Sequence, residues 1–360
     1  MFCPSRLVLA RKRRGFTQKF LAEQIGIESR NIVSYEKGEQ IPSAKTLQGI
    51  SEALKFPLMF FESDDIELVN SNSASFRAFT KLTAGQRDSA LAGGTIGVLF
   101  QEWIDKEFNL PDVSIPNLRG YDPESAAETV RAEWGLGNKP IKNMIHLLES
   151  KGVRIFSLTK ESQNVDAFCF WRTKTPFIFI NITKSPERCR FDAAHELAHL
   201  VLHRHGIAHG KEIEKEADRF AAAFLMPKDS IIALNAFSAT LDSVVDLKKR
   251  WSVSAMALIH RLNSLGIISD WHYRQLCIQA SKKGYRKAEP NGIAPESSQV
   301  LSKIIKNLHG EGLSIKKVAN ELNLSSVELN DLLFGLVATP LDGNGKRSES
   351  PAVRPNLRLV

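Results

Sequence analysis

Apolar residues recur every three to four positions through most of the chain, which predicts a mainly helical protein. In the first sixty residues the pattern indicates amphipathic helices over 17–27, where Gly26 ends the helix, and over 28–36. Two helices at this spacing are typical of a helix-turn-helix unit. Nine apolar positions would fill one small core in this region: Leu7, Ala10, Phe20, Leu21, Ile25, Ile32, Leu47, Ile50 and Leu54.

The middle of the chain changes from helical to mixed periodicity. A long helix is predicted over 83–108, and shorter helices are predicted over 125–134 and 140–151. Three runs rich in Phe, Ile and Val then predict a small β-sheet, at 153–158, 167–172 and 177–182. Further helical patterns follow at 190–203, 212–226, 241–251 and 254–265.

These elements predict a multidomain protein that is mainly α, with an α+β part in the middle. We expect a five-helix domain at 1–65, a helical linker at 66–115 and an α+β domain with the sheet at 116–270. A helical C-terminal region at 271–337 and a disordered tail at 338–360 would follow. Residues 313–336 weakly echo 17–27, so a second helix-turn-helix is one interpretation. A helical hairpin that docks on the α+β domain is the one we favour.

The positive charge of the chain indicates a nucleic-acid partner. The chain has 48 lysine and arginine residues against 40 acidic ones, a formal net charge of +8. Between residues 5 and 19 there are six basic residues and no acidic residue, which we interpret as a phosphate-contacting surface. These six residues are Arg6, Arg11, Lys12, Arg13, Arg14 and Lys19.

The remaining composition points to the cytoplasm. The four cysteines, at positions 3, 169, 189 and 277, have no metal-ligand spacing, so reduced thiols are expected. The first residues lack the apolar stretch of a secretion signal, and no run approaches the ~18 apolar residues of a membrane helix. We therefore expect no membrane association and a location at the nucleoid.

The most informative motif is His195-Glu196-Leu197-Ala198-His199. On a helix, residues four apart share one face, so both imidazoles would point at one metal ion. Glu196 would then lie beside the open position of a zinc ion, where its carboxylate can act as general base on a water held by the metal. The surrounding helix is rich in apolar residues, and a metal would give its buried ionisable groups a partner.

A catalytic zinc needs a third protein ligand, and the sequence offers two sources. His205 lies ten residues after the first histidine, but the longer motif with that spacing needs a glycine where this chain has Leu202. The helix over 212–226 instead places Glu214 and Asp218 one turn apart. Glu214 would bind zinc, and Asp218 would accept the second ring N–H of a ligating histidine. Glu212 is the weaker alternative, because it lacks such a carboxylate partner.

Other ionisable groups near the motif receive structural interpretations. Glu216 would point away from Glu214, toward solvent. His203 and His209 would be capping or partly exposed residues near the end of the helix.

The same region resembles the ImmA/IrrE family of zinc metallopeptidases, which is similar in fold to thermolysin-like enzymes. The resemblance is carried by residues 188–203, by Glu214 to Ala221 and by Leu225-Met226-Pro227. It implies that His195, His199 and Glu214 bind Zn²⁺ and that Glu196 is the base. Ala198 stands where glycine is common in the family, and alanine keeps the helix intact.

Residues 5–62 resemble the Xre, or phage-repressor-like, DNA-binding domain, including Tyr35-Glu36-Lys37-Gly38 and Pro42-Ser43. In such domains the second helix of the motif enters the major groove. The resemblance implies that bases are read by Ser29, Arg30 and Ser34, with Asn31 as a neighbour. It also implies that Gln18 holds a phosphate or an adjacent base. Arg11 and Glu36 match a pair that forms an internal salt bridge in the family.

Together the two resemblances imply a DNA-binding transcription regulator of bacterial or phage type that binds paired half-sites of double-stranded DNA as a homodimer. Characterised ImmA/IrrE members cut a partner repressor, and many relatives with a fused DNA-binding domain have no demonstrated protease activity. One hypothesis is a zinc endopeptidase that cuts a regulatory protein, or itself, in response to a signal. The alternatives are a non-catalytic regulator that senses a ligand or protein, and an antitoxin-like partner of a toxin.

Overall fold

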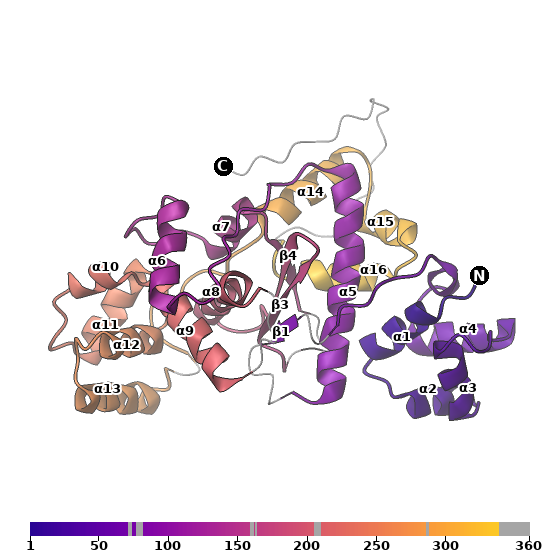
Figure 1. The fold of residues 1–360 in the computed structure, drawn as a ribbon, viewed down its shortest axis with the longest axis horizontal. Coiled ribbons are helices and arrows are strands. Elements are labelled where there is room, and N and C mark those ends of the chain that lie inside the picture. The colour runs from indigo at the N-terminus through magenta and orange to yellow at the C-terminus, as the bar shows by residue number, and fades with distance from the viewer. Residues whose placement is uncertain are drawn as a thin grey trace.

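The computed structural model describes residues 1–70, 74–76, 82–158, 162, 164–204, 210–285 and 288–337. The predictions for His205, for His209 and for a disordered tail from residue 338 concern positions outside these residues. Figure 1 shows the helices of residues 4–54 at one end of an elongated molecule, a sheet with covering helices in the middle, and the helices of residues 228–282 at the other end. Within the described residues, no helix is long and apolar enough to cross a bilayer.

The N-terminal domain consists of four α-helices and a 3₁₀ helix, which are α1 (Pro4–Arg13), α2 (Gln18–Ile25), α3 (Ser29–Glu36), α4 (Ala44–Leu54) and η1 (Leu58–Glu62). The hydroxyl of Thr17 accepts a hydrogen bond from the amide of Phe20 and starts α2. Gly26 ends α2 with φ of 70°, a conformation that glycine adopts without strain. The predicted core is correct except at Phe20, whose side chain is exposed and packs edge-on against Phe16.

The sheet has four strands, β1 (Ala74–Phe76), β2 (Arg154–Ser157), β3 (Ala167–Arg172) and β4 (Thr175–Ile180), in the order β1-β3-β4-β2. Strands β2 and β4 are parallel, and the other pairs are antiparallel. β4 starts two residues earlier than predicted, because a tight hairpin pairs Arg172 with Thr175. Thr173 makes this turn with a positive φ of 54°.

One face of the sheet is a layer of phenylalanine rings covered by α5 (Ala84–Glu107). The rings of Phe168 and Phe179 stack with centroids 4.8 Å apart. Gly94 and Gly97 let the helix lie directly on this layer, since a Cβ added at Gly97 would come within 2.6 Å of the Phe179 ring. The segment 66–115 was expected to be a linker, and this expectation is wrong for β1 and α5, which are part of the central body. The other domain boundaries stay a prediction.

The opposite face of the sheet carries the helix of the histidine motif. α8 (Pro186–Leu202) packs on β3 and β4, and α9 (Lys211–Leu225) packs against both α8 and α6 (Pro123–Glu133). α7 (Met144–Ser150) contacts β2 and α8. α8 starts at Ser185, whose hydroxyl accepts the amide of Arg188, with proline in its first turn.

The chain then runs to the far end of the molecule and returns. α10 (Lys228–Ile232), α11 (Leu241–Leu247), η4 (Lys248–Arg250), α12 (Ala255–Ser264) and α13 (Asp270–Lys282) form a group at the end opposite to the N-terminal domain (Figure 1). α14 (Gln299–Gly310), α15 (Ile315–Glu321) and α16 (Ser326–Leu333) return to the middle. α16 contacts α5 and β2. The C-terminal helices therefore dock on the body, as the hairpin interpretation predicted.

Most of the N-terminal basic run contacts protein, so its interpretation as a phosphate-contacting surface is wrong. Arg13 is fully buried, with its Nε 2.7 Å from Glu328 Oε2 and its Nη2 3.5 Å from Asp331 Oδ2. Nη1 of Arg14 lies 2.7 Å from the other oxygen of Glu328. We call Arg13, Arg14, Glu328 and Asp331 the docking cluster, because it joins α1 to α16.

Three further members of the run also have internal partners. Arg6 is buried and donates to the Asp64 carbonyl at 2.7 Å, while Arg11 donates to Glu36 and Lys12 lies 3.3 Å from Asp88 on α5. Only Lys19 among the six projects into solvent. The reason is tertiary, because the acidic partners come from other helices. α16 supplies the partners of Arg13 and Arg14, α5 supplies that of Lys12, and α3 supplies that of Arg11.

Candidate metal centre and nucleic-acid interface

Three side chains from α8 and α9 bring metal-ligating atoms to one point. Nε2 of His195 lies 3.2 Å from Nε2 of His199, one turn later on α8. Glu214 on α9 places Oε2 3.6 Å from the His195 nitrogen and Oε1 3.6 Å from the His199 nitrogen. Among the described residues, His195, His199 and Glu214 form a group that could hold a metal ion, because their ligand atoms all lie within 4.8 Å of one another.

Hydrogen bonds fix which ring nitrogens face this point. A carboxylate can only accept, so Asp218, with Oδ1 2.9 Å from His195 Nδ1, places the proton of that ring on Nδ1. Glu216 lies 2.9 Å from Nε2 of His203 and likewise takes its N–H. The remaining nitrogen of neutral His203, Nδ1, is then an acceptor. It lies 3.0 Å from Nδ1 of His199, which therefore carries the proton of that ring. His195 and His199 thus keep their Nε2 lone pairs for the shared point.

This donor set fits zinc. Four ligands at the usual Zn–N distance of about 2.0–2.1 Å place neighbouring donors about 3.3 Å apart, close to the 3.2 and 3.6 Å found here. Both histidines are buried, and two lone pairs facing each other need a cation between them. Two imidazoles and one carboxylate leave a fourth position for a water or a substrate.

The alternatives for the third ligand are separated by exposure. Glu212 is largely exposed, and its carboxylate pairs with Lys215 at 2.7 Å instead of facing the histidines. Glu214 is more than two-thirds buried and faces both rings. The geometry therefore favours Glu214, as the sequence argument did.

Glu196 follows the first histidine on α8 and is fully buried beside the centre. Its backbone carbonyl accepts the thiol of Cys169 from β3 at 3.5 Å. Burial, reinforced by the charge of Glu196, raises the pKa of the Cys169 thiol well above its ordinary value. This sulfur therefore stays protonated, and it ties α8 to the sheet.

The pair formed by His203 and Glu216 is the part of the site that the sequence interpretation missed. Glu216 does not simply face solvent, because its carboxylate receives the His203 ring. His203 follows α8 as its cap residue, as expected, but its ring is 10% exposed and orients His199. The signal was present, since His195, His199 and His203 are spaced four residues apart and share one helix face.

The second candidate surface is α3, at the outer end of the N-terminal domain and away from α5 (Figure 1). Ile32 and Tyr35 are buried and anchor this helix. Arg30 projects with 81% of its side chain exposed and lies 2.5 Å from Glu28. Ser29, Asn31 and Ser34 are partly exposed.

Gln18, which was predicted to hold a phosphate or a base, is tied to the domain itself. Its amide donates to Glu36 at 2.6 Å, and Glu36 also receives Arg11 at 2.5 and 2.9 Å. The internal Arg11–Glu36 pair is therefore present, and it fixes α1, the start of α2 and the end of α3 relative to one another.

Comparison with known proteins identifies both regions. The helix-turn-helix family model matches residues 7–61, and the IrrE N-terminal-like domain model matches residues 148–263. Uncharacterized HTH-type transcriptional regulators of Sinorhizobium medicae (strain WSM419) and Rhizobium meliloti (strain 1021) are each 42% identical over 60 residues, which is 17% of this chain and 43% of each relative. The chain thus spans less than half the length of the curated relatives it matches. Both predicted family resemblances are confirmed.

Proposed function

We propose that this helix-turn-helix regulator, which carries an IrrE N-terminal-like domain, binds operator DNA through α3 and uses a zinc endopeptidase centre to cut a regulatory protein. The target would be a partner protein or the chain itself, and cutting would follow a signal. The observation that carries the peptidase part is the convergence of His195, His199 and Glu214 beside the buried carboxylate of Glu196.

In this proposal each side chain has a defined task. His195, His199 and Glu214 would hold the ion, and Asp218 and His203 would keep the two rings oriented. Zinc, when bound, supplies a Lewis acid that polarises a peptide carbonyl and lowers the pKa of a water beside it. Glu196 would take the proton from the attacking water and deliver it to the leaving amine.

The DNA-binding part rests on the exposure of α3. Arg30 is free to reach a base edge and has the geometry for a bidentate contact with guanine. Ser29, Asn31 and Ser34 would contact neighbouring bases or phosphates. One such helix reads only a few base pairs, so a homodimer would bind paired half-sites in the cytoplasm, at the nucleoid.

The first test measures zinc in three purified proteins, which are the wild type, His199→Ala and Glu196→Gln. We expect about one zinc per chain in the wild type and in Glu196→Gln, and none in His199→Ala, because His199 is a proposed ligand and Glu196 is not. The second step compares protein N-termini in cells that carry the wild type or Glu196→Gln. A new N-terminus on a regulatory protein, or on this chain, should appear only with the wild type.

Two outcomes would overturn the peptidase proposal. One is wild-type protein that stays free of zinc in zinc-replete medium. The other is Glu196→Gln protein that holds zinc and regulates its operator as the wild type does. The second outcome would identify the alternative function, a regulator whose metal-binding domain senses a ligand or partner without turnover.

A further inference from the structure

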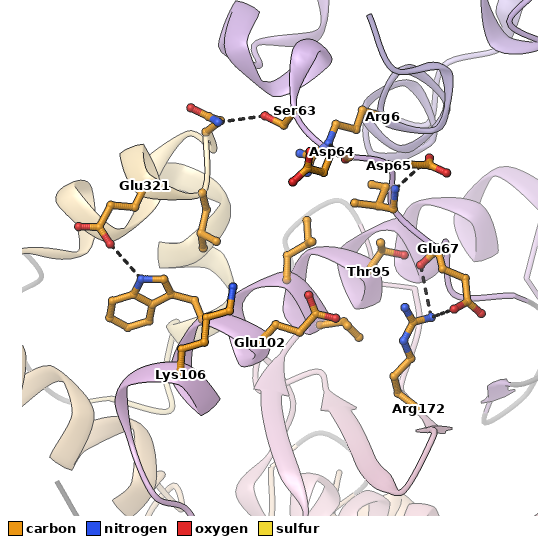
Figure 2. A pocket seen from close by; sticks show the side chains of 16 residues that line it. Arg6, Ser63, Asp64, Asp65, Glu67, Thr95, Glu102, Lys106, Arg172 and Glu321 are labelled. Carbon is orange, nitrogen blue, oxygen red and sulfur yellow. Dashed lines mark hydrogen bonds and ion pairs between the residues drawn. The ribbon is translucent and has the colours of Figure 1, made fainter. Parts of the chain in front are cut away.

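A cavity of about 380 Å³ lies where the N-terminal domain meets the body. Its walls come from four segments that are far apart in the sequence, as Figure 2 shows. These are Arg6 with residues 63–67, which follow η1, the face of α5 that includes Thr95 and Lys106, Arg172 at the end of β3, and residues 321–323 at the end of α15. None of the proposed zinc-site or base-reading residues lines this junction cavity.

Several polar groups of the wall already have partners. Glu321 accepts the indole N–H of Trp103 at 3.0 Å, and Arg172 pairs with Glu67 at 2.9 Å. Asp65 accepts the hydroxyl of Ser5 at 2.6 Å. These contacts shape the cavity and leave other groups to recognise a ligand.

Arg6 is one of the groups that lack a full set of partners. Its side chain is 94% buried, since its relative exposure is 6%. Nε donates to the Asp64 carbonyl, but Nη1 is buried with no hydrogen-bond partner among the described residues. A buried guanidinium N–H left without an acceptor is costly. Burial also lowers the pKa of Arg6, despite the nearby charges of Cys3, Asp64 and Asp65.

Glu102 and Lys106 supply charges of both signs on α5. They lie one turn apart, and Figure 2 shows both side chains pointing from the helix into the space below Arg6. Glu102 and Lys106 both line the cavity, and neither forms an ion pair with any described residue. Val98, Leu99, Trp103 and Leu322 provide apolar wall beside them.

From these observations we infer that the junction cavity binds a small zwitterion, a free amino acid with an apolar side chain. Its carboxylate would accept from Arg6 and Lys106, and its ammonium group would donate to Glu102. Asp64 and Asp65 beside Arg6 make a simple anion unfavourable, so the positive group of the ligand is required. The volume lies within the range of small-molecule sites.

The position of the cavity gives the ligand a regulatory role, which rests on the proposed operator binding. Arg6 lies on α1 of the DNA-binding domain and residues 63–67 follow η1, whereas Glu102 and Lys106 lie on α5 of the body. Asn323 already bridges the two parts by donating to the Ser63 hydroxyl at 2.9 Å. A ligand that contacts both sides changes the relative stability of their arrangements, and therefore the affinity for DNA.

Direct binding to the full-length zinc-loaded protein is the test. L-leucine, L-phenylalanine and L-tryptophan are titrated by calorimetry, each beside its decarboxylated amine and its N-acetyl derivative. We expect at least one amino acid to bind and both derivatives to lose at least tenfold in affinity. Glu102→Gln and Lys106→Gln should each weaken binding at least tenfold, whereas Glu107→Gln, an exposed position on the same helix that does not line the cavity, should not.

Failure of all three amino acids to bind would overturn the inference, and so would equal binding of the amines, which would indicate a cation site. Binding that Glu102→Gln and Lys106→Gln leave unchanged would place the ligand elsewhere. Operator affinity is measured separately, with and without the amino acid. Unchanged affinity would refute the regulatory role, whereas absence of DNA binding in every state would refute the proposed function and leave the cavity site standing.

Discussion

Glu328→Gln should open the contact between the DNA-binding domain and the C-terminal helices. Glu328 is 1% exposed and neutralises Arg13, which is fully buried, at 2.7 Å. Glutamine keeps the shape but removes the negative charge that faces Arg13 and Arg14, and the contact of Arg13 with Asp331 is longer, at 3.5 Å. Removing one partner of a buried pair costs about 3–5 kcal/mol, which raises the open population more than a hundredfold.

Hydrogen exchange measured by mass spectrometry would report this opening in peptides from α1 and α16. We expect both to lose protection in Glu328→Gln while peptides from α8 keep it. Asp88→Asn is the matched control, because it breaks the Lys12–Asp88 pair between α1 and α5, whose side chains are 35% and 42% exposed. Such exposed pairs contribute at most about 1 kcal/mol.

The double variant Arg13→Gln, Glu328→Gln decides whether the loss comes from an unpaired buried charge. If it does, the double variant should lose clearly less stability than the sum of the two single variants. Additive losses, or a Glu328→Gln effect no larger than that of Asp88→Asn, would refute the reasoning.

Three further predictions concern other regions. His203→Ala should weaken zinc binding about 10–100-fold in a chelator competition, because His199 would lose the group that orients it; unchanged affinity would count against this role. Burial raises the pKa of Glu149 from 4.5 to about 7, so the folded state binds a proton more tightly than the unfolded state does. The free energy of unfolding should therefore fall by up to about 3 kcal/mol as the pH rises from 4.5 to 7. Urea unfolding of Glu149→Gln should lack this fall, and a slope equal to that of the wild type would contradict it. Arg30→Ala should cost about 1–3 kcal/mol in operator affinity and relax specificity at one base pair, whereas Lys19→Ala should act equally on all sequences in the same titrations.

Local patterns were enough to predict the helix of the candidate metal centre. The two histidines and Glu196 lie within one and a half turns of α8, so their relation depends on helix geometry alone. Glu214 comes from a different helix, and its place followed from the spacing to Asp218 together with the family resemblance. The structure adds that the α8–α9 contact brings Glu214 to the histidines instead of Glu212.

Tertiary partners explain what the sequence did not reveal. Arg13 and Lys19 have the same charge and lie in the same basic run, yet one is fully buried against residues more than 300 positions away and the other is exposed. No local pattern distinguishes them. The role of α5 was hidden for a similar reason, because Gly94 and Gly97 weaken a helix by propensity and are explained only by the phenylalanine layer beneath them.

The order of layers shows how the two candidate sites are connected. α8 lies on one face of the sheet and α5 on the other, and the second side of α5 contacts α1 of the DNA-binding domain. The hydroxyl of Ser89 on α5 donates to the Arg13 carbonyl at 3.1 Å, so the docking cluster and α5 hold α1 together. Gly94 and Gly97 let α5 pack closely on the phenylalanine rings of the sheet. Any coupling between the candidate metal centre and α3 has to cross α5 and its contact with α1, and the junction cavity lies on that boundary.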